Sequence, residues 1–410
     1  MNNKQTEQAT TTPLPAEIKM LHIYIYKLVS QLKLHRNNYE IMIRSHIFRG
    51  IRFYSNAQPL DILFFGSDTF SIHSYKTLQQ ISLRQPNLIS KLQLVTRPPK
   101  WCGRKKSILK KPEILKYIES QRGTQPLLCD TRQDMLDSLS PWLSKSRNSM
   151  LIAVSYGKLI PSELIDTANY SLNVHPSLLP RYKGSAPIQH TLLNNDSVTG
   201  VSIQTLDPVK FDNGEIIART PEIDVQNLLQ SQQVERVPGY MTRIMIDQLG
   251  KIGSELLRDV IQSGTYSNHS PLPNLYKPSW ATTIKTNDKQ IRWFKYTADY
   301  ISRMIGILGP VFTFKRTQLG KVHRSTESFT EKRVLLHDVT AIKWPSQDLL
   351  PGQFQFDSIA NVIRVGCAEN TQLEIKKLQF EACAIETSDE FMRKLKKRCG
   401  PKAAELMCFN

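Results

Sequence analysis

Residues 171–189 read Ser-Leu-Asn-Val-His-Pro-Ser-Leu-Leu-Pro-Arg-Tyr-Lys-Gly-Ser-Ala-Pro-Ile-Gln, with an asparagine and a histidine two residues apart near the start. The apolar run from Tyr170 to Val174 predicts a strand, on which residues two apart point to the same side. Asn173 and His175 would therefore look into one cleft. Acyl transfer needs such a pair, one group to manage a proton and one to hold a developing oxyanion. A core histidine beside a turn-forming asparagine is the alternative.

The residues after this strand predict a loop, a helix and a second strand. Two prolines and a glycine between 176 and 184 interrupt regular structure. Pro187 can begin a helix, with Ser185 as its candidate N-cap. A strand is then expected over 201–206, and the loop 207–214 follows it.

Four apolar runs upstream alternate with helical patterns, which predicts parallel βαβ units. The expected strands are Asp61–Phe65, Leu92–Thr96, Pro126–Cys129 and Ser149–Val154. We therefore expect an α/β fold with a Rossmann-like, doubly wound parallel sheet. Ligands of such sheets bind beyond the carboxyl ends of the strands, where Ser155, Asn173 and His175 lie. The sequence contains no G-x-G-x-x-G fingerprint and no Walker-type phosphate loop.

Three motifs follow in order: Ser155-Tyr-Gly-Lys-Leu-Ile-Pro161, Asn173-Val-His175 with Pro-Ser-Leu-Leu-Pro after it, and Asp212-Asn-Gly214. In this order and spacing they closely resemble the folate-dependent formyltransferase family. The resemblance implies that Asn173, His175 and Asp212 are the catalytic trio. It also implies that 10-formyltetrahydrofolate is the formyl donor. No metal is expected, because the trio lacks a ligand cluster of recognisable spacing.

The resemblance further implies where the pterin of the cosubstrate lies. It would contact the loops 155–161 and 206–214, largely through backbone groups. The lining residues implied are Tyr156, Gly157, Ile160, Leu206 and Asp207. For Tyr156, ordinary packing is an equal alternative.

The loop 97–111 is the most charged of the chain, with seven basic residues and no acidic one. Prolines and Gly103 predict irregular structure, and Trp101 offers a face for base stacking. A solvated charge run is the alternative. However, the loop resembles the insertion that distinguishes family members acting on methionyl-tRNA. That resemblance implies a set of tRNA contacts with Arg104 as the main one: Arg97, Arg104, Lys105, Lys106, Lys110 and Lys111.

The composition indicates more than one domain and an anionic partner. The 410 residues exceed one compact core, and 54 Lys and Arg against 36 Asp and Glu give a net charge of +18. Such an excess favours nucleic acid or an anionic surface; a targeting peptide and a solvated surface are the alternative. Six cysteines without a C-x-x-C pair predict free thiols in a reducing compartment.

Residues 1–57 do not resemble domain material. Residues 42–60 contain no Asp or Glu, and Arg44, Arg49 and Arg52 alternate with isoleucines at helical spacing. This is the pattern of a transit peptide, and we expect the mitochondrial matrix as the destination. A surface helix is the alternative. The apolar run 20–32 is too short to span a bilayer, so no membrane association is expected.

The composition changes after a proline-rich stretch. We expect a catalytic domain over 58–268, a linker over 269–285 and a second domain over 286–410. A helix over 296–308 and β-rich segments after it suggest a small barrel, and the resemblance implies an OB-like one that binds tRNA. Its expected basic groups are Lys315, Arg316, Lys321, Arg324 and the run Arg393–Arg398.

The family resemblance covers residues 60–405 and implies one reaction. A formyl group would pass from 10-formyltetrahydrofolate to the α-amino group of methionyl-initiator tRNA in mitochondrial translation initiation, by an enzyme expected to be a monomer. Two alternatives stay open. One is a formyltransferase for a small-molecule amine, and the other is a non-catalytic RNA-binding protein on the same scaffold.

Overall fold

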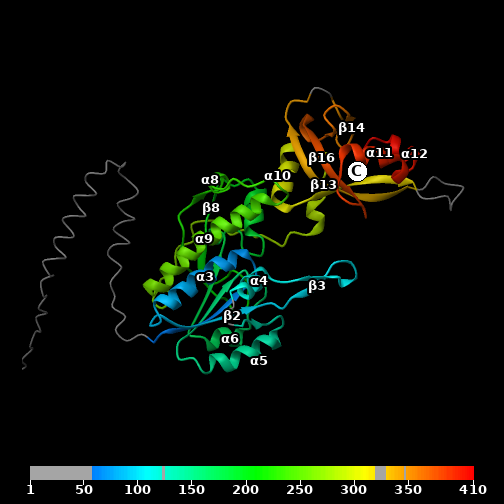
Figure 1. The fold of residues 1–410 in the computed structure, drawn as a ribbon. Coiled ribbons are helices and arrows are strands. Elements are labelled where there is room, and N and C mark those ends of the chain that lie inside the picture. Colours follow the sequence, from blue (N-terminus) through cyan, green and yellow to red (C-terminus); the bar gives the residue numbers. More distant parts are fainter. Residues whose placement is uncertain (1–57, 122–124, 319–328, 346–347) are drawn as a thin grey trace, which may run out of the picture. The chain divides into compact units, whose positions relative to one another are not determined.

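The computed structural model describes residues 58–121, 125–318, 329–345 and 348–410 (Figure 1). The predicted transit peptide, residues 1–57, lies outside the described residues, as do Lys321 and Arg324. The backbone of Arg104 is described, but its side chain is not.

Seven of the described strands form one sheet in the order β10-β9-β7-β6-β1-β2-β5. Their bounds are β10 Ile216–Arg219, β9 Ser202–Thr205, β7 Tyr170–His175, β6 Ser149–Val154, β1 Leu60–Gly66, β2 Ile89–Thr96 and β5 Leu127–Leu128. The five strands from β7 to β5 are mutually parallel, whereas β9 and β10 run antiparallel at one edge. The predicted parallel α/β sheet is confirmed, with an antiparallel extension that the sequence did not reveal.

Helices cover both faces of this sheet, because the side chains of the interior strand β1 alternate between two hydrophobic clusters. Ile62 and Phe64 of β1 belong to one cluster, and Leu63 and Phe65 to the other. Figure 1 shows α3 and α9 on the first face and α5 and α6 on the second. The helix bounds are α3 Thr69–Arg84, α4 Glu113–Ser120, α5 Arg132–Leu143, α6 Ser162–Thr167, α7 Pro187–Leu193, α8 Val225–Gln230 and α9 Tyr240–Ser263.

Two local predictions need correction. Pro187 begins α7 as expected, but its N-cap is Ala186, and the Ser185 hydroxyl pairs instead with the Thr283 hydroxyl at 2.7 Å. The loop 97–111 is not irregular: β3 Lys100–Cys102 and β4 Ile108–Lys110 pair as a hairpin around the short helix η1 Arg104–Lys106. Its turn has positive φ at Gly103, Lys105 and Lys106. Gly103 therefore allows the chain to reverse direction between β3 and β4, and the two strands still pair.

The C-terminal part begins with α10 Ala298–Leu308 and continues as an antiparallel sheet. The strand order is β12-β13-β16-β15-β14, with β17 paired to β16. Their bounds are β12 Val311–Gln318, β13 Phe329–Ile342, β14 Phe354–Asp357, β15 Val362–Gly366, β16 Gln372–Phe380 and β17 Glu386–Thr387. The remaining elements are α11 Ser388–Cys399, α12 Pro401–Glu405, the small sheet of β8 Val198–Thr199 with β11 Ile223–Asp224, and the 3-10 turns η2 Thr286–Lys289 and η3 Ala368–Asn370. The β-rich prediction is confirmed, whereas the OB-like topology stays a prediction.

Lys315 is not a surface charge, contrary to the expectation from the sequence. Its side chain is fully buried, and Nζ donates to the carbonyl oxygens of Ala403 at 2.6 Å and Leu406 at 2.7 Å. Burial lowers the pKa of this lysine. Alternation along β12 places Lys315 on the same inward face as Val311, so its ammonium group caps the end of α12. The run 393–398 lies in α11, where Lys394 and Arg398 both pair with Glu386.

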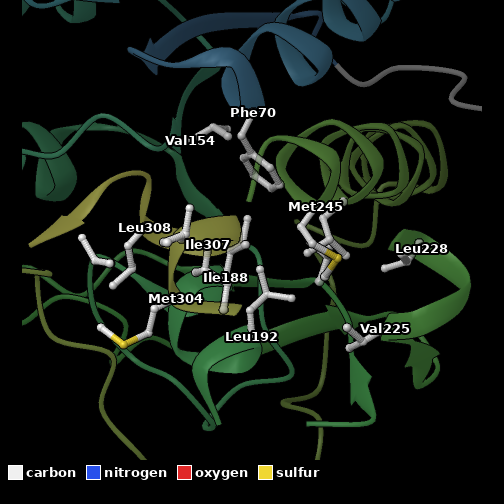
Figure 2. Packing of buried hydrophobic residues seen from close by; sticks show 14 of the residues in the cluster. Phe70, Val154, Ile188, Leu192, Val225, Leu228, Met245, Met304, Ile307 and Leu308 are labelled. Atoms are coloured by element: carbon white, nitrogen blue, oxygen red, sulfur yellow. The ribbon is translucent and has the colours of Figure 1, made fainter. Parts of the chain in front are cut away.

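The first helix of the C-terminal part packs against helices of the preceding sheet domain. Thr242 of α9 donates its hydroxyl to the Ile307 carbonyl of α10 at 2.8 Å. Figure 2 shows Met304, Ile307 and Leu308 of α10 in one hydrophobic cluster with Ile188 and Leu192 of α7. The two parts therefore share a core.

Candidate active site

The candidate site lies where the parallel part of the sheet meets its antiparallel edge. Asn173 and His175 come from β7, which is parallel to β6 and antiparallel to β9. Asp212 comes from the loop that joins β9 to β10. The structure thus brings Asp212 next to Asn173 and His175, from which it lies almost forty residues away in the sequence.

Asp212 is the centre of the cluster. Its Oδ1 accepts from Asn173 Nδ2 at 3.0 Å and from Gln204 Nε2 at 3.0 Å, and it lies 3.3 Å from His175 Nδ1. Its Oδ2 accepts from the backbone N–H of Gly184 at 2.8 Å. The side chains of His175 and Asp212 are 6% and 8% exposed, so these contacts are largely shielded from water. Four groups around one buried carboxyl fix its orientation.

The hydrogen bonds of His175 define where its protons are. Nε2 lies 2.9 Å from the carbonyl oxygen of Tyr182, which can only accept, so Nε2 carries a hydrogen. Nδ1 faces the carboxylate of Asp212, and that contact is attractive only when a proton lies between the two atoms. The contact with Asp212 sets the orientation of the imidazole ring.

The loop that carries Asp212 is shaped by close backbone approach. A Cβ atom at Gly214 would lie 1.8 Å from the carbonyl oxygen of Thr205, so only glycine fits. Asp212 itself has a positive φ of 52°. At the start of the loop, Asp207 Oδ1 accepts from the backbone of Val209 and Lys210, both at 2.8 Å, and these bonds lower the pKa of Asp207. The loop is thus pinned at both ends.

The loop after β7 is held by a distant segment. The backbone of Lys183 accepts from Ala281 and donates to Ser279, so part of the predicted linker pairs beside it. Gly184 has a φ of 119°, and a Cβ there would lie 2.6 Å from the Ala281 carbonyl oxygen. This close packing positions the Gly184 N–H that donates to Asp212.

Sequence reasoning missed Gln204 and the two backbone contacts of the site, Gly184 N–H and Tyr182 C=O. Gln204 is 1% exposed and is the register partner of Asn173. A signal was present, because Gln204 is a large polar residue in the middle of a predicted strand and lies on the same face as Ser202. The backbone groups carry no sequence signal.

The residues expected to line the folate pocket occupy different environments. The Tyr156 side chain is buried, its hydroxyl donates to the Cys129 carbonyl at 2.7 Å, and burial raises its pKa. Ile160 is buried in the same cluster, and Leu206 packs against it. Gly157, with a φ of 75°, presents backbone at the sheet edge. Ligand contacts from Tyr156 and Ile160 would therefore use backbone groups.

The basic hairpin β3–β4 begins near the loop 155–161. Arg97 lies just before β3, and its Nη1 is 3.9 Å from the position that a Cβ at Gly157 would occupy. Arg97 Nε is buried and has no hydrogen-bond partner within the described part of the chain. Lys105, Lys106 and Lys110 are exposed, whereas Lys111 pairs with Glu119 at 2.9 Å. Trp101, Ile108 and Leu109 are also exposed on the hairpin, at 60%, 60% and 42%. The hairpin thus presents cations and apolar surface together.

Asp68 adds a perturbed carboxyl at the end of β1. It caps α3 by accepting from the Ser71 N–H at 3.0 Å. Burial raises the pKa of Asp68 to about 6, against the opposing effect of the Ser71 and Ser155 hydrogen bonds.

Three further observations concern the described residues. None of their His, Cys, Asp and Glu side chains form a group of three or more that could hold a metal ion. None of their helices has both the length and the apolar character of a membrane span. All six cysteines are free thiols, as predicted.

The chain is similar to proteins of known activity. A model of the formyl transferase family matches residues 60–237. The mitochondrial methionyl-tRNA formyltransferase of Saccharomyces cerevisiae is 40% identical over 380 residues, covering 86% of this chain and 93% of that protein. The human mitochondrial methionyl-tRNA formyltransferase is 25% identical over 76% of this chain and 72% of its own length. The methionyl-tRNA formyltransferase of Thermodesulfovibrio yellowstonii is 30% identical over 57% of this chain and 68% of its own length.

Proposed function

Because this chain belongs to the methionyl-tRNA formyltransferase family, we propose that it formylates the α-amino group of methionine on initiator tRNA, with 10-formyltetrahydrofolate as the donor. The observation that carries the proposal is the convergence of Asn173, His175 and Gln204 on the carboxyl of Asp212. The mitochondrial names of the relatives and the basic segment 42–60 support action in the mitochondrial matrix.

The proposed reaction begins when the neutral amine attacks the formyl carbon. The carbonyl oxygen then becomes an oxyanion, and it needs a fixed donor. Asn173 has two amide hydrogens, one of which is bonded to Asp212. The second is available for the oxyanion, and the bond to Asp212 keeps the amide from rotating away.

The His175–Asp212 pair would handle the proton of the attacking amine. As the C–N bond forms, the amine nitrogen becomes positive, and it must lose a proton before tetrahydrofolate leaves. A proton held between His175 and Asp212 would stabilise the negative charge on the formyl oxygen. The proton that the amine gives up would pass by way of this pair to the N10 nitrogen of tetrahydrofolate, as the bond from N10 to the formyl carbon breaks. Because Nε2 of His175 is bonded to Tyr182, Nδ1 is the nitrogen that takes part.

We place the contacts to the two substrates in loops at the carboxyl ends of strands. We assign the folate to Gly157, Leu206 and Asp207 together with the backbone of Tyr156 and Ile160. We assign the acceptor end of the tRNA to the hairpin, with Arg104 as the main contact and these residues beside it: Arg97, Lys105, Lys106, Lys110 and Lys111. Exposed cations with an aromatic side chain support an RNA contact.

The domain division follows from the same features. We propose a targeting segment over 1–57, a catalytic domain over 58–268, a connection over 269–285 and a tRNA-binding domain over 286–410 with an OB-like barrel. The antiparallel C-terminal sheet supports this division. We propose that the protein acts as a monomer.

The test is a formylation assay with purified protein. Methionyl-initiator tRNA and 10-formyltetrahydrofolate are supplied, and formyl-methionine is released from the tRNA and measured. Formylation of free methionine or of a small amine at a similar rate would contradict the tRNA proposal. RNA binding without formyl transfer would indicate a non-catalytic protein.

A further inference from the structure

We infer that Gln204 is a positioning residue for Asp212: its amide holds the carboxylate in place while Asn173 is engaged by the oxyanion. The inference rests on the proposed function. Gln204 lies in the middle of β9, between β7 and β10, and is paired in register with Asn173 and Ile216. At 1% exposure it cannot contact a substrate, so its effect must pass through a neighbour.

The orientation of the Gln204 amide is set by charge. Nε2 lies 3.0 Å from Asp212 Oδ1. The reversed amide would place two acceptor oxygens at that distance, which is repulsive while the carboxyl is ionised. The other end of the amide, Oε1, is buried and has no partner among the described residues. An apolar side chain of equal length would bury no unpaired oxygen at this position. Glutamine therefore bears the free-energy cost of that oxygen, and its hydrogen bond to Asp212 is the contact that offsets this cost.

Asp212 needs this support because its own loop provides little packing. Val209 and Phe211, just before it, are 73% and 53% exposed. The carboxyl is therefore held by the four donors described above. Two of those donors, Asn173 and His175, take part in the proposed chemistry. Gln204 and the Gly184 N–H remain in place throughout, and Gln204 is the one of these two that a substitution can remove.

The first test compares Gln204→Met with the wild-type enzyme under single-turnover conditions. We expect the rate of formyl transfer to fall by about ten- to a hundredfold, the usual worth of one hydrogen bond to a charged group. KM values for tRNA and folate should stay within about twofold, because no substrate contact is lost. Gln93→Met is the matched control: Gln93 lies on β2, donates to backbone carbonyls, and should leave the rate unchanged.

The second test is a double-mutant cycle with Asp212→Asn. If Gln204 acts through Asp212, Gln204→Met will have little further effect in the Asp212→Asn background. An equal loss in both backgrounds would overturn the inference and indicate a general structural role. A rate within about twofold of wild type in Gln204→Met would also overturn it.

Two additions keep the tests decisive. Gln204→Asn retains a polar amide but is one methylene too short to reach Asp212, so it should reproduce the loss if Gln204→Met does not fold. ¹⁵N-histidine NMR, with the His175 signals assigned by His175→Gln, reports the pair without any assay. We expect the Nδ1 signal to move in Gln204→Met but not in Gln93→Met. Unchanged Nδ1 signals would overturn the inference, whereas an inactive wild-type protein would overturn only the proposed reaction.

Discussion

Asn173 and Gln204 are register partners across β7 and β9, and both amides donate to the same oxygen of Asp212. One amide is half-buried at the cleft and the other is buried. The carboxylate is thus held by side chains from two neighbouring strands of the sheet. Loss of Asn173 should therefore remove a group that acts on the substrate directly, whereas loss of Gln204 should act on the reaction through Asp212.

Asn173→Ala and His175→Ala should each lower kcat by about a hundredfold or more, because each removes an oxyanion donor or a proton-handling group. The variants should fold, since Gln204 and Gly184 still hold Asp212. Rates are measured with methionyl-tRNA, and circular dichroism checks folding. Near-normal turnover of His175→Ala would mean that the reaction takes place elsewhere.

Gly214→Ala should destabilise the protein by about 3 kcal/mol or more, because the new methyl overlaps the Thr205 carbonyl oxygen. Gly309→Ala is the control, since Gly309 has a positive φ of 78° but no atom within 4 Å of the position that the new methyl would occupy. It should cost about 1–3 kcal/mol, from backbone strain alone, because Gly309 has a ψ of −161°. Urea denaturation measures both free energies of unfolding, and equal losses would contradict the steric account.

Asp68→Asn should change how stability depends on pH. The pKa of Asp68 is about 6 in the folded protein and 3.8 in an ordinary environment, so the folded state binds the proton more tightly. Its contribution to stability is therefore greatest below about pH 4 and declines as the pH rises to about 6. Asparagine still caps α3 but does not titrate. Between about pH 4 and pH 7, the free energy of unfolding of the variant should therefore rise by about 2 kcal/mol relative to that of the wild type. A constant difference in unfolding free energy would contradict this.

Arg104→Ala should weaken methionyl-tRNA use by about 1–3 kcal/mol and leave folate binding intact. Lysine at this position should also weaken it, because guanidinium grips phosphate with two parallel hydrogen bonds. The salt dependence of tRNA binding should become shallower by about one phosphate contact. Lys111→Ala, whose lysine already pairs with Glu119, is the control and should have a smaller effect. Equal loss of folate and tRNA binding would indicate that the hairpin supports the fold.

A fusion of residues 1–60 to a soluble reporter should enter mitochondria, since import reads a positive amphipathic segment. Replacing Arg44, Arg49 and Arg52 by glutamate should abolish entry. Fluorescence microscopy and protease protection of the reporter provide the measurement. Cytosolic retention of the unmutated fusion would contradict the proposed compartment.

The sequence predicted features that depend on local pattern. The strand 149–154 and the helix start at Pro187 agree with the structure, because apolar runs and proline restrict the backbone directly. The cluster of Asn173, His175 and Asp212 was also predicted, but from the resemblance of the motif order to a known family and not from local pattern. For Lys315, the charge predicts a surface position, whereas the alternation along β12 predicts the buried one that the structure has.

Features that depend on tertiary contacts were not predictable in this way. The contact between Gln204 and Asp212 requires the register of β9 against β7 and the path of the loop 207–214. The hairpin β3–β4 was missed because Gly103 and two prolines indicate irregular backbone when each is considered alone. Cross-strand pairing overrides that local preference.

The packing of α10 against α7 and α9 has a consequence for dissecting this protein into fragments. A fragment that ends in the proline-rich stretch 270–279 would expose Ile188 and Leu192 to water and lose the Thr242–Ile307 hydrogen bond. Each side chain exposed in this way costs about 1.5–3 kcal/mol. A protease that nicks this stretch should therefore leave two pieces that stay associated, and the isolated N-terminal piece should aggregate when expressed without its complement.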